Sequence, residues 1–310
     1  MFFVYWFGGE LNPLFDLFIS IPWWLHIVPI TIFSVIYALY IQKIPHLGIM
    51  LIVIFAVPFI FTVRTVPERL PARTNDTIKT CLLNTKYYFA NTDIIESLIL
   101  LRNEDCDIYF FQEVWRAREN RPQLEENISQ IFQGYFAEYR GEFVTLSRFF
   151  IESSNLGPHE GYLKTVVTKN DLKISLYNVH FWNPLFDRPC QSFEDRIYAE
   201  KCLIPAFDIR KMQADELRAE LAADNSFIVI GGDFNSMQNS KIIQDLKTRF
   251  VPFYSETFGL NSTFQSNLPL IKIDFVFVPQ SVKLARSGMK RVCLDSLSDH
   301  CLSITQFDIR

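Results

Sequence analysis

The hydrophobic positions of the chain form two regions with different patterns. The first 63 residues are almost continuously apolar and contain only three charged side chains, Glu10, Asp16 and Lys43. Beyond them, short apolar runs alternate with polar ones, as in a folded domain. We therefore divide the chain into a hydrophobic segment, residues 1–63, a linker rich in proline and polar residues, 64–77, and a domain, 78–310.

Two stretches of the hydrophobic segment are long enough to cross a bilayer as helices. Trp23–Ile41 carries no charge, and a second uncharged stretch runs from Ile44 to Val63. A helix rises about 1.5 Å per residue, so about 20 apolar residues span the hydrocarbon core. We predict a transmembrane hairpin that makes the chain an integral membrane protein, with the lipid bilayer as its partner. A buried pair of hydrophobic helices is the alternative.

The side of the membrane that the domain faces stays open. Arg64, Arg69 and Arg73 follow the second stretch, and this basic bias favours the cytoplasm. Cys190 and Cys202 flank a polar insertion, and a disulfide between them would instead suit an oxidising compartment. Two free thiols are the other reading of this pair.

A zinc site is not expected, because none of the six cysteines lies in a C-x-x-C pair. Cys81 and Cys293 lie in apolar runs, so we interpret them as small core residues.

Apolar periodicity within the domain predicts strands interleaved with few helices, which indicates a mixed α/β or α+β fold. The helices expected are 92–102 and 208–222, the second with Ile209, Met212, Leu217 and Leu221 facing inward. The strands expected are 78–83, 107–111, 143–146, 165–168, 173–179, 227–230, 271–278 and 302–307.

Polar side chains gather where these apolar runs stop, and ligand sites in such sheets form at strand ends. The clusters are Asn84, Gln112-Glu113, Asn178 with His180, Asp233 with Asn235, and Ser298-Asp299-His300. Each is weak alone: Glu113 could be a solvated loop residue, the Gly-Asp-Phe-Asn run a turn, and His180 a core histidine. Asp274 is different, because a carboxylate inside an apolar strand requires a partner. We predict that His300 is that partner.

Taken in order, these clusters resemble the endonuclease/exonuclease/phosphatase superfamily, which includes deoxyribonucleases, abasic-site endonucleases, inositol polyphosphate phosphatases and neutral sphingomyelinases. The resemblance covers about residues 78–310. Further matching segments are Leu146-Ser147-Arg148, Arg210 with Gln213, Thr263-Phe264, Leu268-Pro269 and Lys272-Ile273-Asp274. Two positions depart from the pattern, Phe150 where proline is frequent and Lys272 in place of arginine.

The resemblance implies a four-layer sandwich of two packed β-sheets flanked by helices. It also implies hydrolysis of a phosphate ester with Mg²⁺, for which Mn²⁺ can substitute. Glu113 would be the main metal ligand, assisted by Asn84 and Asp299. Asp274 would orient His300, which either activates water or stabilises charge on the phosphoryl group. Asp233 would orient the water, and Asn235 and His180 would bind phosphate oxygens.

The substrate is the least determined property. The anchor, the net charge of −4 and a similarity of Gly161-Tyr162-Leu163-Lys164 to a sphingomyelinase strand favour a phospholipid head group. A membrane-tethered nuclease is the alternative, with aromatic and basic residues available near the motifs: Trp115, Arg116, Arg118, Phe181 and Trp182. A non-catalytic scaffold that kept the fold is a third hypothesis. The sequence specifies neither a protein partner nor the number of metal ions.

Overall fold

The structure is a computed structural model. It describes residues 70–86, 94–114, 121–183, 203–238, 240–253, 263, 272–282, 288–293 and 298–309. The predicted transmembrane hairpin, Cys190 and Cys202 lie outside these residues. Within the described ranges, no helix combines the length and the apolar character needed to cross a membrane.

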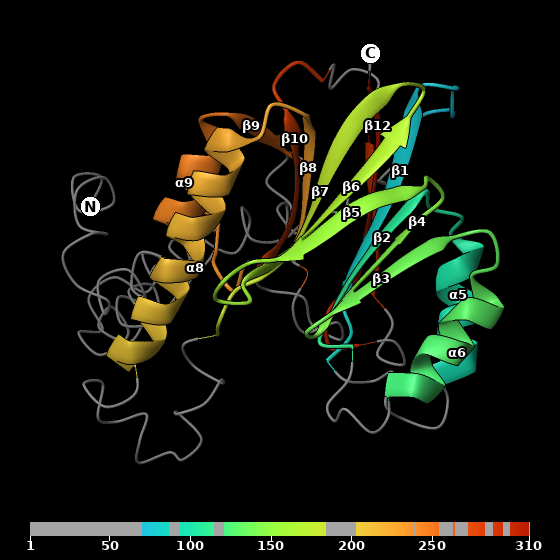
Figure 1. Ribbon diagram of the computed structural model, residues 1–310, viewed down its shortest axis with the longest axis horizontal. Helices are drawn as coiled ribbons and strands as arrows, with labels where there is room; N and C mark the ends of the chain where they lie inside the picture. Colours follow the sequence, from blue (N-terminus) through green and yellow to red (C-terminus); the bar gives the residue numbers. More distant parts are fainter. Residues whose placement is uncertain are drawn as a thin grey trace, which may run out of the picture.

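The described residues form two six-stranded mixed sheets (Figure 1). The first sheet has the order β11 (Gly288–Val292), β12 (Leu302–Asp308), β1 (Thr77–Asn84), β2 (Ile108–Gln112), β4 (Phe143–Ser147) and β3 (Phe136–Arg140). The second has the order β5 (Ile151–Leu156), β6 (Tyr162–Lys169), β7 (Leu172–His180), β8 (Phe227–Asp233), β10 (Asp274–Pro279) and β9 (Phe250–Pro252).

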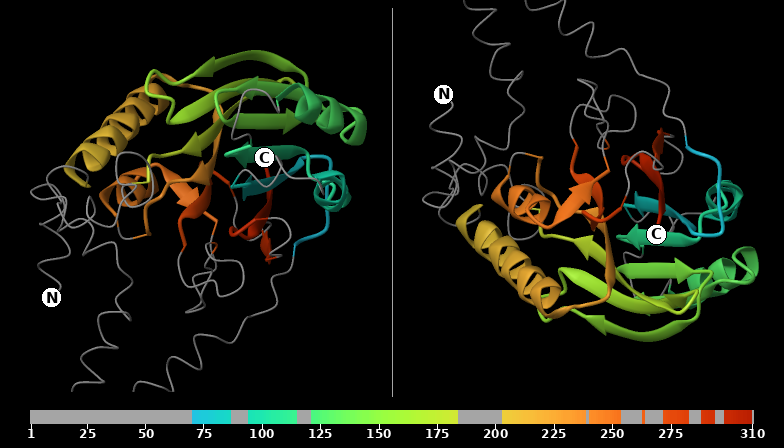
Figure 2. Two further views of the ribbon diagram at one scale, coloured as in Figure 1. Left: turned by 90° about the horizontal axis from the view of Figure 1, so that it is seen from below. Right: turned by 90° about the horizontal axis from the view of Figure 1, so that it is seen from above.

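The two sheets pack face to face, with helices on both outer sides. Figure 2 shows α5 (Ile94–Asn103) and α6 (Arg121–Ile131) on one outer side and α8 (Leu203–Ala223) and α9 (Lys241–Lys247) on the other. An inter-sheet core fills the middle and includes Ile78, Leu82, Phe110, Leu176, Val229 and Phe307. Separate apolar clusters lie beneath each helix pair. The predicted arrangement of two packed sheets flanked by helices is confirmed.

Two parallel strand pairs bring distant polar residues to one edge of the sandwich. β1 and β2 run parallel, with Asn84 opposite Gln112 at their carboxyl ends. β7 and β8 also run parallel and end with His180 opposite Asp233. Because β10 is antiparallel to β8, its first residue, Asp274, lies opposite Asp233.

Several helices and strands were not predicted, because their sequences are polar or short. They are α6, α9, β3, β5, β9 and β11. The predicted inward face of α8 was also wrong at Met212, which is 42% exposed, while Leu217 and Leu221 are buried. Gln213 and Ala214 are the buried neighbours instead, since the face of α8 that packs on the sheet is partly polar.

The prediction that Cys81 and Cys293 are small core residues holds for Cys81, which is fully buried, and is wrong for Cys293, which is partly exposed. Cys81 forms a disulfide with Cys106, and Cys293 forms one with Cys301. The partners lie 25 and 8 residues apart in the sequence, so only the sheet topology brings them together.

Part of the segment interpreted as a linker contacts the domain. Leu70 packs against the apolar cluster beneath α5 and α6. The guanidinium of Arg73 donates hydrogen bonds to both carboxylate oxygens of the buried Asp107, at 2.6 and 2.7 Å. Residues 70–76 therefore fix where the chain enters β1.

The close approach of β7 and β8 requires glycine at position 232. A Cβ atom placed there would lie 1.9 Å from the carbonyl oxygen of Val179. We expect Gly232→Ala to destabilise the protein by about 4 kcal/mol or more, because backbone cannot move away as a flexible side chain can. Gly134→Asn is the control: a Cβ at Gly134 would have no neighbour within 4 Å, and asparagine tolerates its positive φ. Thermal melting of the full chain measures both, and equal melting temperatures would contradict this account.

Candidate active site

Asn84 joins the two sheets at the edge where the parallel strands end. It closes β1 and is fully buried. Its Nδ2 donates to Glu113 Oε1 at 2.8 Å and to Asp233 Oδ2 at 3.0 Å. Glu113 follows β2 in the first sheet and Asp233 ends β8 in the second, so one amide links carboxylates from both sheets.

His300 and Asp274 form the buried pair that the sequence predicted. His300 Nδ1 lies 3.0 Å from Asp274 Oδ2, and both side chains are almost fully buried. The other ring nitrogen, Nε2, lies 3.7 Å from Asp233 Oδ2. Asp233 therefore lies between the Asn84–Glu113 contact and the His300–Asp274 pair, and the separated sequence clusters converge on one place.

A second histidine–carboxylate pair lies on the other side of Glu113. His180 Nδ1 bonds to the carboxylate of Glu142, and Nε2 lies 3.4 Å from Glu113 Oε1. Glu142, which lies between β3 and β4, was not among the predicted residues. Its only local signal is the Gly141-Glu142 turn, which does not reveal that the turn lies beside β7.

Two predicted polar residues have mainly connecting roles. Asn178 lies between the sheets, where its Nδ2 donates to the carbonyl oxygens of Phe111 and Val144. Asn235 accepts a hydrogen bond from Asn183 and donates one to the carbonyl oxygen of Phe181, at 2.8 and 2.7 Å. Its backbone N–H donates to Asp233 Oδ1 at 2.7 Å, so Asn235 also orients that carboxylate.

Asp299 lies at the rim of the cluster. Its carboxylate forms an ion pair with the ammonium of Lys86, two residues after Asn84. Asp299 Oδ1 is 4.0 Å from His300 Nε2. Lys86 was not singled out from the sequence, because a lone exposed lysine carries no pattern.

The family profile of the Endonuclease/Exonuclease/phosphatase family matches residues 98–300, which is well over half of the chain. The chain belongs to this family. The resemblance expected from the motifs is thereby confirmed at the level of the family. No curated protein matches the chain.

Solved structures share the family fold with little sequence identity. Truncated Caenorhabditis elegans TDP2 is 13% identical with a TM-score of 0.52, covering 75% of this chain and 98% of that one. SmcL is 15% identical with a TM-score of 0.54, covering 76% and 100%. The 3′ phosphatase NExo from Neisseria, bound to a product DNA hairpin, is 15% identical with a TM-score of 0.53, covering 74% and 99%. At these identities the likeness establishes the fold alone.

The buried charges of this cluster shift one another's pKa values. Burial and the neighbouring charge of Asp274 raise the pKa of Asp233 to about 7. Burial alone lowers the pKa of His300, but the Asp274 carboxylate outweighs it and raises that pKa to about 9. The pKa of His180 is raised well above its usual value in the same way, because Glu142 outweighs burial. The carboxylate partners therefore favour the charged form of both histidines.

Two site residues hold backbone conformations that side chains disfavour. Glu113 has a φ of 50° and Asn235 a φ of 45°. Such conformations persist where the surrounding contacts fix them, and they concentrate at functional sites. Glu113 directly follows β2 and Asn235 lies two residues after the end of β8. The turn at Glu113 directs its side chain to Asn84, and the turn at Asn235 directs its backbone N–H to Asp233.

The donor set fits a hard divalent cation. Atoms of Glu113, His180 and Asp233 that could bind a metal lie within 4.8 Å of one another, as do those of Asp233, Asp274 and His300. Since Mg²⁺ prefers oxygen ligands and retains several waters, Glu113 and Asp233 are the suitable members. The Asn84 amide nitrogen faces these carboxylates, so its oxygen could contribute only after the amide turned over.

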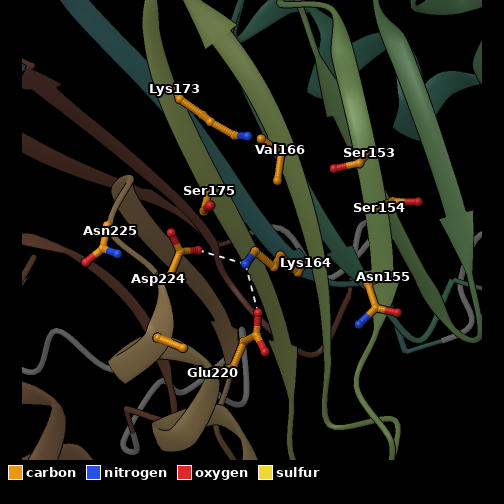
Figure 3. Close-up of a pocket in the computed structure, with 11 residues that line it drawn as sticks. Ser153, Ser154, Asn155, Lys164, Val166, Lys173, Ser175, Glu220, Asp224 and Asn225 are labelled. Atoms are coloured by element: carbon orange, nitrogen blue, oxygen red, sulfur yellow. Dashed lines mark hydrogen bonds and ion pairs between the residues drawn. The ribbon is translucent and has the colours of Figure 1, made fainter.

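A cavity of about 440 Å³ lies elsewhere, along β5, β6 and β7 beside the end of α8 (Figure 3). Lys164 crosses it and forms ion pairs with Glu220 and Asp224, at 2.8 and 2.9 Å. None of the predicted site residues lines this cavity. Lys164 belongs to the segment that is similar to a sphingomyelinase strand. Its ion pairs lie outside the buried cluster of predicted site residues.

Removing the charge of Asp274 should change how His300 titrates. In Asp274→Asn we expect the pKa of His300 to fall, because the carboxylate that raises it is gone and burial still opposes the charge. The limb of the pH–rate profile that reports His300 should therefore move to lower pH. Asp215→Asn, on the exposed face of α8, is the control. A profile unchanged by Asp274→Asn would show that this pair does not govern the reaction.

Proposed function

We propose that this domain is a Mg²⁺-dependent hydrolase that cleaves a phosphodiester or phosphomonoester by in-line attack of water. The proposal rests on one observation: Asn84, Glu113, Asp233, Asp274 and His300 form a continuous chain of contacts between the two sheets. Membership of a family of nucleases and phosphatases supports it.

Glu113 would be the principal metal ligand, with Asp233 and Asn84 beside it. A bound Mg²⁺, or Mn²⁺ in its place, would neutralise charge on the phosphate and orient the ester. Asp299, also predicted as a ligand, is paired with Lys86 through Oδ2. It would assist through Oδ1 or through water.

Asp233 would orient the attacking water and accept its proton as the new P–O bond forms. The backbone N–H of Asn235 holds one oxygen of this carboxylate, at 2.7 Å, and so orients it for that role. The bond to the leaving oxygen breaks at the opposite side of phosphorus, and that oxygen takes up a proton from solvent. Charged His300 would stabilise negative charge on the phosphoryl oxygens, while His180 and Asn235 would bind the remaining oxygens.

A phospholipid head group is the substrate that we favour. The supporting observations are the hydrophobic segment of residues 1–63, which we propose as a membrane anchor, and the net charge of −4, which disfavours binding to many phosphates. Nucleic acid is the second candidate, supported by the DNA-bound structure of NExo, which shares the fold.

Burial limits which of the aromatic residues proposed to contact nucleic acid could reach it. Phe181 is fully buried and packs edge-on against Phe234, so it belongs to the core. Trp182 is partly buried, and its backbone N–H donates to Gln213. Trp115, Arg116 and Arg118 lie outside the described residues.

Activity on a substrate panel tests the proposal. With Mg²⁺ the full chain should hydrolyse phospholipid in vesicles of sphingomyelin or phosphoinositide, and added EDTA should abolish turnover. Glu113→Gln should lower kcat/KM by about 100-fold or more, because it removes a charged metal ligand. Glu160→Gln is a matched control, since Glu160 is an exposed glutamate with a similar φ of 53°.

Each other outcome has a defined meaning. Cleavage of plasmid DNA or RNA without lipid turnover would replace the phospholipid proposal with the nuclease one. Absence of hydrolysis on every substrate would favour the non-catalytic scaffold. Equal activities of Glu113→Gln and Glu160→Gln would refute the assignment of the metal ligand.

We further propose that the domain faces an oxidising compartment. Two disulfides among the described residues of the domain support this orientation, because disulfides persist in such compartments and are rare in the cytosol. They outweigh the three arginines that favour the cytoplasm, since a charge bias this small constrains orientation weakly.

Protease protection tests the orientation. In sealed right-side-out vesicles, added protease should remove the domain without detergent, and in inside-out vesicles the domain should be protected. The reverse pattern would place it on the cytoplasmic side. Release of the intact domain by carbonate washing would argue against the membrane anchor itself.

A further inference from the structure

A disulfide closes the loop that carries His300. β11 and β12 are antiparallel neighbours, and the last pair in their register is Val292 with Leu302. Cys293 and Cys301 are the next positions on each strand, with Cα atoms 4.2 Å apart. This spacing is close to that of a cross-strand pair without hydrogen bonds. The bond therefore clamps the base of the loop, immediately next to His300.

The same clamp is tied to Asp274, the partner of His300. The backbone N–H of Cys301 donates to the carbonyl oxygen of Thr263 at 2.6 Å. Thr263 Oγ1 in turn accepts from the backbone N–H groups of Ile273 and Asp274, at 3.3 and 3.2 Å. Thr263 thus connects the disulfide in the first sheet with the start of β10 in the second.

The other end of the described part of this loop is held by Ser298. Its hydroxyl donates to the carbonyl oxygen of Asn84 at 2.6 Å and accepts from the backbone N–H of His300 at 3.0 Å. His300 lies between this anchor and the disulfide. The disulfide thus acts beside the Ser298 hydroxyl, the Cys301–Thr263 hydrogen bond and the ring contact with Asp274, and it is the one covalent link among these contacts.

We propose that Cys293 and Cys301 are positioning residues for the hydrolysis, and that full activity requires their disulfide. The inference rests on the proposed function and deepens it. The bond does not touch substrate; it acts by fixing the backbone on one side of His300. Misplacement of a catalytic group by about 1 Å can lower a rate by about 100-fold.

Cys81–Cys106 provides a matched comparison. It lies in the fully buried cluster beneath α5 and α6, away from the strand ends that form the site. It closes a longer segment, of 25 residues against 8, so its removal should lower stability at least as much. If the disulfides served stability alone, removing Cys81–Cys106 should have the larger effect. If Cys293–Cys301 positions His300, removing Cys293–Cys301 should cause the larger loss of activity.

The experiment compares Cys293→Ser/Cys301→Ser with Cys81→Ser/Cys106→Ser in the full chain, at a temperature well below the melting point of both. We expect the first variant to lose about 10-fold or more in kcat, with KM within about twofold of the parent. The second should keep kcat within about twofold while melting at a lower temperature. In a His300→Gln background, removing Cys293–Cys301 should cause little further loss, because both changes act through the same group.

Three outcomes would overturn the proposal. They are an unchanged kcat in Cys293→Ser/Cys301→Ser, an equal loss of kcat in both disulfide variants, and full additivity with His300→Gln. Each leaves the proposed hydrolysis intact, because the parent is active in all three. A parent without Mg²⁺-dependent hydrolysis would instead refute the proposed function, and this inference with it.

Discussion

The pairing of two buried carboxylates across neighbouring strands is the constraint on which the site depends. Asp233 and Asp274 face each other between β8 and β10, and each is only 1% exposed. Like charges this close cannot both remain ionised without cations nearby. His300 supplies one positive charge, and the proposed metal beside Glu113 would supply another. The rest of the sandwich can be understood as the framework that holds these charges in place.

That framework works because strand direction decides which residues meet. Two parallel pairs, β1 with β2 and β7 with β8, end at the same edge, and the antiparallel β10 begins there. Glycine at position 232 lets β8 approach β7 closely enough to place Asp233 beside His180. Asn84 then joins the sheets through hydrogen bonds to a carboxylate from each. An inter-sheet core of large apolar side chains excludes water behind these polar residues and strengthens their interactions.

The two disulfides show how one covalent bond can have different consequences at different places. Cys81–Cys106 lies inside an apolar cluster that already orders its neighbours. Cys293–Cys301 closes a loop whose described part is otherwise held by polar contacts, among them the hydrogen bonds of Ser298 and Cys301 and the ion pair of Asp299 with Lys86. In the first setting the bond adds to stability, whereas in the second it fixes the backbone beside a reacting group. An oxidising compartment, proposed from the presence of both bonds, would keep that second bond intact.

The family and the mixed α/β class could be predicted from the sequence alone. So could most residues of the candidate site, because polar residues after apolar strands are a local signal. The sequence also identified the Asp274–His300 pair, since a carboxylate within an apolar strand demands a partner wherever the chain folds. Short polar elements such as α6 and β11 could not be predicted, because their hydrophobic periodicity is weak. Only the tertiary structure decided that Glu142 pairs with His180, that Lys86 engages Asp299, and that Cys293 meets Cys301. Proximity in the sequence does not create these contacts. Strand order and the packing of the two sheets bring the residues together.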